Sequence, residues 1–206
     1  MRIILLVNWG LGLEVLKSLR HLPDVEIALV VTQYQKGNLD QWFNAVYDYA
    51  VENGYRVIVQ ESASFEYLRE MIIKSNIDLL ISHAFMRILP KTLFSAPKYG
   101  SINIHPSLLP KYRGPSPTEW VISKGEKVTG LTCHYIDEGI DTGDIIYQLD
   151  VPVEPNDTVG SIIERQKNIV APLLAVSLSR VCDRNFKPVP QVSEFASYAP
   201  RLNTRG

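Results

Sequence analysis

Short apolar runs alternate along the first half of the chain with segments in which apolar residues recur every three or four positions. Continuous apolar runs are typical of strands that are buried on both faces of a parallel sheet, and the longer period is typical of helices that cover it. The pattern predicts an α/β fold with a mostly parallel sheet and helices on both faces. The predicted strands are Arg2–Val7, Glu26–Thr32, Arg56–Val59, Asp78–Ser82 and Gly100–Ile104, and the predicted helices are Leu11–Arg20, Leu39–Asn53, Phe65–Ser75 and Lys91–Ser95.

The rhythm changes after Gly114. A short helix at Ser116–Ser123 is followed by two runs, Thr129–Ile136 and Ile145–Val153, which predict an antiparallel strand pair appended to the sheet. An apolar stripe then predicts one helix from Val159 to about Arg180.

We expect this helix to be capped by Asn156 or Asp157 and kinked at Pro172. Prolines and weak periodicity from Phe186 onward indicate an extended tail. The predicted organisation is one domain over residues 1–185, followed by a tail over residues 186–206.

The composition restricts the classes of partner. With 206 residues, 46% of them hydrophobic, the chain can bury a sizeable core, so disorder is excluded. The net charge of −1 makes nucleic acid an unlikely partner. The apolar stretch Ile169–Leu178 is too short to cross a membrane. Cys133 and Cys182 form no C-x-x-C pair, which favours a reducing, cytoplasmic setting over a zinc site.

The first predicted strand leads into a glycine-containing loop, Asn8-Trp9-Gly10-Leu11-Gly12. Such loops can bind phosphate through backbone N–H groups. The dinucleotide motif is incomplete, because Val15 stands where a third glycine is needed and Thr32 ends the second strand without an acidic residue. A nicotinamide cofactor is therefore not predicted, and the loop is either an anion site or a tight turn.

Asn103 and His105 lie two positions apart at the end of the fifth predicted strand. Residues with this spacing point to the same face of a strand, and open α/β sheets place their active sites at the carboxyl ends of strands. An asparagine amide can donate to a developing oxyanion, and a histidine can exchange a proton near neutral pH. The pair predicts a catalytic site, and the alternative is that both side chains satisfy backbone groups.

Seven carboxylates and no basic residue occupy the segment 137–157. Its acidic and glycine residues do not follow the calcium-loop pattern, so no metal is predicted. The remaining alternatives are a solvated turn and a catalytic carboxylate facing His105. Spacing alone does not choose among Asp137, Asp141 and Asp144.

Three motifs occur together in the order that resembles the folate-dependent formyltransferases: Phe-Met-Arg-Ile-Leu at 85–89, Asn-Ile-His-Pro-Ser-Leu-Leu-Pro at 103–110 and Asp-Glu-Gly-Ile-Asp-Thr-Gly at 137–143. The resemblance implies a Rossmann-like formyltransferase fold and transfer of a formyl group from N10-formyltetrahydrofolate to a primary amine. By motif match it implies that Asn103, His105 and Asp141 are the catalytic residues.

The same resemblance implies the ligand contacts. The residues that would hold the folate are Phe85, Met86, Arg87, Ile88, Leu89, Leu108, Leu109, Ile136, Asp137, Glu138 and Ile140. Candidate contacts for the acceptor are Asn8, Trp9, Lys111 and Arg113, because cations and an aromatic ring suit a diphosphate and a base. His134 is expected to be structural, because it falls within an alternating strand pattern.

The acceptor branch is the open question. The motif His-Pro-Ser-Leu-Leu-Pro-Lys-Tyr-Arg-Gly and the tail Ser-Tyr-Ala-Pro-Arg resemble the sugar-nucleotide formyltransferases, so the favoured acceptor is a small-molecule amine on a nucleotide-linked sugar. The alternatives are glycinamide ribonucleotide, methionyl-tRNA and, in another class, a folate-binding module without catalysis. A homodimer is compatible with this interpretation.

Overall fold

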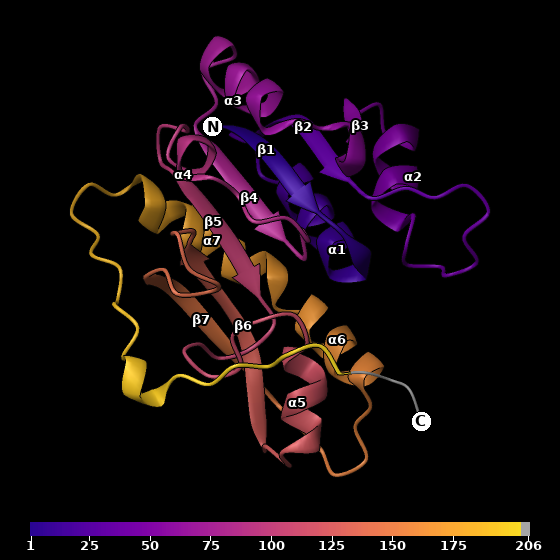
Figure 1. Cartoon of the computed structure of the whole chain (residues 1–206), viewed down its shortest axis with the longest axis vertical. Helices are drawn as coiled ribbons and strands as arrows, with labels where there is room; N and C mark the ends of the chain where they lie inside the picture. Colours follow the sequence, from indigo (N-terminus) through magenta and orange to yellow (C-terminus); the bar gives the residue numbers. More distant parts are fainter. Residues whose placement is uncertain (203–206) are drawn as a thin grey trace. The chain divides into compact units, whose positions relative to one another are not determined.

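The computed structural model describes residues 1–202 (Figure 1). The chain forms two compact units, Met1–Asn103 and a second that begins at Ile104, and each is described by itself. The boundary falls within β5 (Ser101–His105), so this strand contributes its first three residues to one unit and its last two to the other.

The first unit is built on parallel strands in the order β3-β2-β1-β4-β5. The strands are β1 (Arg2–Val7), β2 (Glu26–Thr32), β3 (Val57–Val59), β4 (Leu79–His83) and β5. The helices are α1 (Trp9–Arg20), α2 (Ala45–Glu52), α3 (Phe65–Lys74) and α4 (Lys91–Phe94), with a 3₁₀ turn at Gln60–Ser62. Strands β1 and β4 are almost entirely buried, as the continuous apolar runs predict.

The turn from β1 into α1 is tight. A Cβ atom at Gly12 would lie 3.1 Å from the Cβ of Val7, so the glycine lets the helix approach the strand that precedes it. Trp9, the first residue of α1, has a φ of +64°. These observations support the tight-turn reading of the glycine loop.

The second unit centres on the antiparallel pair β6 (Val128–Tyr135) and β7 (Ile145–Pro152), which follows the end of β5 in the strand order. Its helices are α5 (Pro117–Ser123), α6 (Val159–Lys167) and α7 (Val170–Cys182), with a 3₁₀ turn at Ser193–Phe195. Helix α7 packs on β6 and β7 and buries residues such as Leu173 and Leu174 (Figure 1). The predicted class, a mostly parallel α/β sheet with an appended antiparallel pair, is confirmed.

Two predicted helices differ from the structure. Residues 39–44 are not helical, and α2 begins at Ala45; Leu39, whose side chain is 98% exposed, was an apolar position without a packing partner. The predicted helix from Val159 to Arg180 is divided between α6 and α7 at residues 168–169. Pro172 lies in the first turn of α7, where its missing N–H leaves no hydrogen bond unmade. The helix divides at Asn168, four residues before Pro172, where a proline ring clashes with the helical carbonyl, so the interruption predicted for Pro172 takes the form of a break one turn earlier.

The N-cap of α6 is Thr158, not Asn156 or Asp157. Its hydroxyl accepts from the backbone N–H of Ser161 at 3.2 Å. Asp157 pairs with Arg165 instead, with Oδ2 2.9 Å from Nη1.

Over residues 186–202 the tail is largely extended and is tied to the second unit by backbone hydrogen bonds; the last four residues of the predicted tail lie outside the described residues. Val189 exchanges two bonds of 2.8 Å with Ile145 at the start of β7. Further along, Arg113 donates to the Ser197 carbonyl at 2.9 Å and accepts from the N–H of Ala199 at 2.6 Å. The tail therefore joins the beginning of β7 to the loop that precedes α5.

Candidate active site

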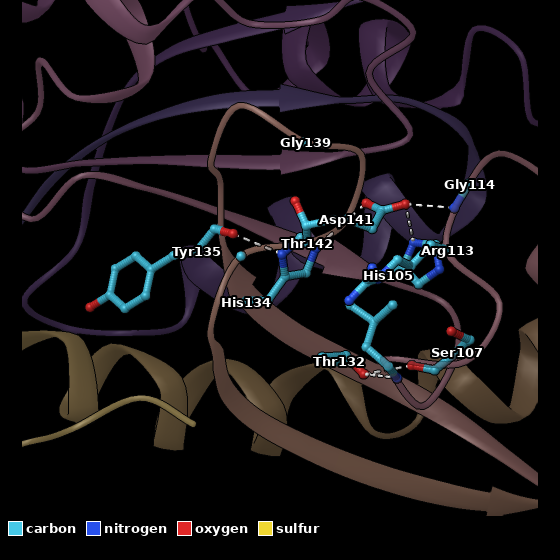
Figure 2. Close-up of polar contacts among 12 residues, drawn as sticks. His105, Ser107, Arg113, Gly114, Thr132, His134, Tyr135, Gly139, Asp141 and Thr142 are labelled. Carbon is cyan, nitrogen blue, oxygen red and sulfur yellow. Dashed lines mark hydrogen bonds and ion pairs between the residues drawn. The ribbon is translucent and has the colours of Figure 1, made fainter. Parts of the chain in front are cut away.

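A partly buried carboxylate lies between two buried imidazoles in the second unit (Figure 2). Oδ2 of Asp141 is 3.4 Å from Nδ1 of His105, and Oδ1 is 3.6 Å from Nε2 of His134. His105 comes from the end of β5 and His134 from the end of β6, while Asp141 comes from the loop between β6 and β7. The structure thus brings His105 and Asp141 together, and among the three carboxylates that spacing left open it places Asp141 beside the histidine.

The loop around Asp141 is shaped to present the carboxylate. Asp141 has a φ of +53°, in the left-handed region, which costs an ordinary residue about 1–2 kcal/mol but is visited by aspartate more readily than by most others. Its Oδ2 accepts from the backbone N–H of Gly114 at 2.8 Å. Earlier in the loop, Oδ1 of Asp137 accepts from the N–H of Gly139 at 3.0 Å and from the hydroxyl of Thr142 at 2.6 Å, which makes Asp137 a turn-forming residue.

Each imidazole is oriented by a backbone carbonyl. Nε2 of His105 lies 2.7 Å from the carbonyl oxygen of Tyr112, and Nδ1 of His134 lies 2.8 Å from the carbonyl oxygen of Tyr135. A carbonyl oxygen can only accept, so these two nitrogens carry the protons. The other nitrogen of each ring therefore faces the carboxylate of Asp141, where it can take up a proton.

The surroundings shift the pKa values of both members of the His105–Asp141 pair. Burial lowers the pKa of His105, against the opposing effects of the Asp141 carboxylate and the Tyr112 carbonyl. Burial favours the neutral form of Asp141 as well, but the two histidines and the Gly114 N–H outweigh it and hold the pKa of that carboxyl far below its usual range. The carboxylate is ionised at neutral pH and can act as a base or as a partner for an imidazolium.

These shifts predict how stability depends on pH. Because the pKa of His105 is lower in the folded chain than the unfolded value of about 6.5, the unfolded chain binds the additional proton as pH falls. The free energy of unfolding should then decrease between pH 7 and pH 5, by at most about 1.4 kcal/mol per pH unit for one proton. Below about pH 4, protonation of Asp141 should weaken the fold further, since its pKa is also lowered.

Urea unfolding at several pH values would measure this slope in the parent chain and in His105→Gln. The slope between pH 7 and pH 5 should be smaller in His105→Gln and unchanged in His21→Gln, which alters an exposed histidine. A free energy of unfolding that rises as the pH falls through this range would contradict the prediction.

His134 belongs to this cluster, although its strand pattern does not predict a role there. Its alternation within a strand predicts a structural role, but His134 is the penultimate residue of β6, and the loop that carries Asp141 begins after Tyr135. Its position two residues before Ile136, at a strand end, was the signal that could have found it. Asn103 lies two residues before His105 on β5, and its catalytic role remains a prediction.

The segment 85–89 of the first unit is irregular and presents alternate side chains to solvent. Met86 is 53% exposed and Ile88 is 76% exposed, whereas Leu89 is buried. Nη1 of Arg87 donates to the carbonyls of Gln60 and Ala63 at 2.9 and 2.7 Å, and its guanidinium lies 4.1 Å from the ring centroid of Phe65. The Arg87 side chain therefore fixes the segment, and the exposed apolar side chains are the ones available to a ligand.

The other residues predicted to hold the folate also include both buried and exposed side chains. Leu109 is buried, and its N–H donates to the Thr132 hydroxyl at 3.1 Å. Ile140 is 49% exposed beside Asp141. Of the set, Ile140 offers the most accessible apolar surface in the second unit, together with the half-buried Leu108.

The four residues predicted for the acceptor differ in accessibility. Asn8 is fully buried, and its amide is engaged with Thr32, Gln33, Gln60 and the Ala84 carbonyl. Trp9 is exposed, and its ring meets that of Phe43 edge-on with centroids 5.3 Å apart.

In the second unit, Lys111 is exposed, whereas Arg113 donates through Nε and Nη2 to Oε1 of Gln191 at 3.0 and 2.8 Å. Among residues 1–202, no group of three or more His, Cys, Asp and Glu side chains is arranged to hold a metal ion. Over the same residues, none of the helices is both long and apolar enough to span a membrane.

The sequence resembles curated methionyl-tRNA formyltransferases. It is 38% identical over 186 residues to the protein of that name from Agathobacter rectalis, a match that includes 86% of this chain and 58% of the relative. It is 42% identical over 133 residues to that from Geobacillus thermodenitrificans, a match that includes 65% of this chain and 42% of the relative. The chain thus spans about three fifths or less of the length of these relatives.

Solved structures with the same fold include other formyltransferases. The phosphoribosylglycinamide formyltransferase from Bacillus halodurans matches with a TM-score of 0.72 and 27% identity, over 89% of this chain and 96% of that one. The N-formyltransferase from Helicobacter canadensis, solved with folinic acid and dTDP-3-aminofucose, matches with a TM-score of 0.74 and 24% identity, over 97% and 70% of the two chains. Residues 5–174 match the sequence profile described as "Formyl transferase", so the chain belongs to the formyl transferase family.

Proposed function

We propose that this chain transfers a formyl group from N10-formyltetrahydrofolate to a primary amine. The observation that carries the proposal is the ionised carboxylate of Asp141 between two oriented imidazoles, at the position that the family motif implies for the catalytic carboxylate. Membership of the formyl transferase family supports the donor, as do relatives and structural neighbours that are formyltransferases.

The residues account for the charges that the reaction creates. Attack of an amine nitrogen on the formyl carbon makes a tetrahedral oxyanion, which the amide of Asn103 and a protonated His105 would stabilise. The nitrogen must lose a proton, and Asp141 accepts it directly or through a water molecule. His105 is suited to receive that proton, because its Nδ1 already faces Oδ2 of Asp141.

The reaction then balances without a further reagent. A bond forms between the amine nitrogen and the formyl carbon, and the bond between that carbon and N10 of the folate breaks. The proton lost by the amine is returned to N10, so the imidazole–carboxylate pair ends in its starting state. In the second unit, the exposed apolar side chain of Ile140, next to Asp141 in the sequence, is suited to contact the flat folate ring system.

The acceptor best supported by the relatives is the amine of methionyl-tRNA. The sequence motifs favoured an amino-sugar nucleotide, but the curated relatives at 38–42% identity are methionyl-tRNA formyltransferases, whereas the sugar N-formyltransferase matches at 24%. The near-zero net charge argued against tRNA. That argument is weakened because the chain spans only 58% of the length of the Agathobacter relative.

An amino-sugar nucleotide is the second candidate, and one observation favours it. Trp9 presents a partly exposed indole ring against Phe43 at the end of β1, which suits stacking with a nucleotide base. Trp9→Ala would therefore separate the two acceptors, because it should weaken use of a sugar nucleotide more than use of tRNA.

The proposal is tested by incubating the chain with N10-formyltetrahydrofolate and, separately, methionyl-tRNA, an amino-sugar nucleotide series and glycinamide ribonucleotide. We expect formyl transfer to methionyl-tRNA. Formyl transfer only to an amino-sugar nucleotide would show that this compound, and not methionyl-tRNA, is the acceptor. Binding of the folate by calorimetry with no transfer to any amine would overturn the proposal and leave a binding module.

A further inference from the structure

The side chain of Gln191 in the tail is hydrogen-bonded to both loops that surround Asp141. Its Nε2 donates to the carbonyl oxygens of Asp141 and Gly143, at 2.9 and 2.7 Å. Its Oε1 accepts from Nε and Nη2 of Arg113, at 3.0 and 2.8 Å. The orientation of the amide is fixed by chemistry, because a guanidinium can only donate and a carbonyl can only accept.

Gln191 joins the loop that carries the Asp141 carboxylate to the loop that donates a hydrogen bond to it. Asp141 belongs to the loop between β6 and β7. At the end of this loop Gly143 packs closely against the end of β6, because a Cβ at Gly143 would lie 1.9 Å from the Tyr135 carbonyl oxygen. Arg113 precedes Gly114, whose N–H donates to Oδ2 of Asp141. Gln191 therefore restrains the backbone of Asp141. It also restrains Arg113, the residue next to Gly114, whose N–H binds the carboxylate.

Gln191 is itself held in place by the tail. Two residues earlier, Val189 exchanges backbone hydrogen bonds with Ile145, and further along the tail Ser197 and Ala199 are bonded to Arg113. Backbone hydrogen bonds therefore hold the tail on both sides of Gln191, so its side chain can restrain the loop that it contacts. We infer that Gln191 is a positioning residue for Asp141, and that its amide keeps the carboxylate oriented toward His105 during formyl transfer.

The inference rests on the proposed function for its kinetic part, and Gln191→Met tests it. Methionine has a similar length but cannot form the four hydrogen bonds. A small displacement of a reacting group typically costs up to about 100-fold in rate, so we expect kcat with methionyl-tRNA to fall about 10- to 100-fold. The loss should appear mainly in kcat, because two of the hydrogen bonds of Gln191 go to the backbone of the loop that carries Asp141.

Gln191→Glu separates the two halves of the network. Its carboxylate can still accept from Arg113 but cannot donate to the carbonyls of Asp141 and Gly143. The inference predicts a loss of kcat like that of Gln191→Met. Normal turnover in Gln191→Glu would show that the Arg113 contact alone matters and would overturn the assigned role. Val192→Ala, at an exposed position of the same tail, is the matched control and should behave as the parent chain.

A second measurement does not depend on catalysis. Asp141 raises the pKa of His105 against the effect of burial, so release of the Asp141 loop in Gln191→Met should lower the titration midpoint of His105, followed by NMR of the imidazole nitrogens. An unchanged midpoint together with unchanged kcat would overturn the inference. If the parent chain transfers no formyl group but the midpoint shifts, the proposed function fails while the positioning of Asp141 by Gln191 stands.

Discussion

Asp141→Asn should reduce kcat for formyl transfer by about 10²- to 10⁴-fold, the range typical of losing a general base. The asparagine keeps the side-chain shape and can still accept from the Gly114 N–H, so the loop should retain its conformation. It cannot accept a proton from the attacking amine, and it gives no charge to stabilise an imidazolium at His105, 3.4 Å away. Steady-state kinetics with methionyl-tRNA would measure the loss, and calorimetry should show that folate binding survives.

Asp144→Asn is the control for this prediction. Asp144 lies three residues further along the same loop and is one of the three carboxylates that spacing alone does not separate. It should retain near-normal turnover. If Asp144→Asn were as inactive as Asp141→Asn, the effect would be one of loop charge, and the assignment of the base to Asp141 would be wrong.

Asn103→Ala should lower kcat by about 10²- to 10³-fold, the usual cost of removing one donor to a developing oxyanion. Because the amide would strengthen its bond only as the tetrahedral centre forms, KM for the amine should change little. The same assay, run at saturating folate, measures both constants.

Asn103→Asp distinguishes the donor from the shape of the side chain. Aspartate occupies the same volume but offers no N–H and adds a negative charge where the oxyanion develops, so it should be at least as inactive as the alanine variant. Substantial activity in Asn103→Asp would remove Asn103 from the catalytic set, whatever the alanine variant does.

The fold was predictable where burial alone determined the pattern. The runs at β1 and β4 could only be central strands, because nearly every residue in them is apolar. The hydrophobic pattern gave a wrong helix boundary at Leu39, because this apolar side chain is exposed and does not pack against the core. It also failed at residues 168–169, where the helix divides, because the apolar stripe continues across the break from Ile162 to Leu173.

The candidate site was predictable only in part. The strand alternation placed His105 at a strand end, and the motif resemblance selected Asp141 from its loop. The partnership of Asp141 with His134 depends on how the loop folds back on β6, and the restraint by Gln191 depends on a contact 50 residues away along the chain. Hydrophobic periodicity carries no information about such contacts between polar groups.

The left-handed backbone at Asp141 has a consequence for how this loop can vary. Glycine adopts that conformation without penalty, so a glycine there would relax the turn while removing the reactive group. Larger or branched side chains would suffer at the same angles. A glycine would also lose the hydrogen bond from Gly114 and the two imidazole partners, so relief of the backbone and loss of the carboxylate act on stability in opposite directions at this one position.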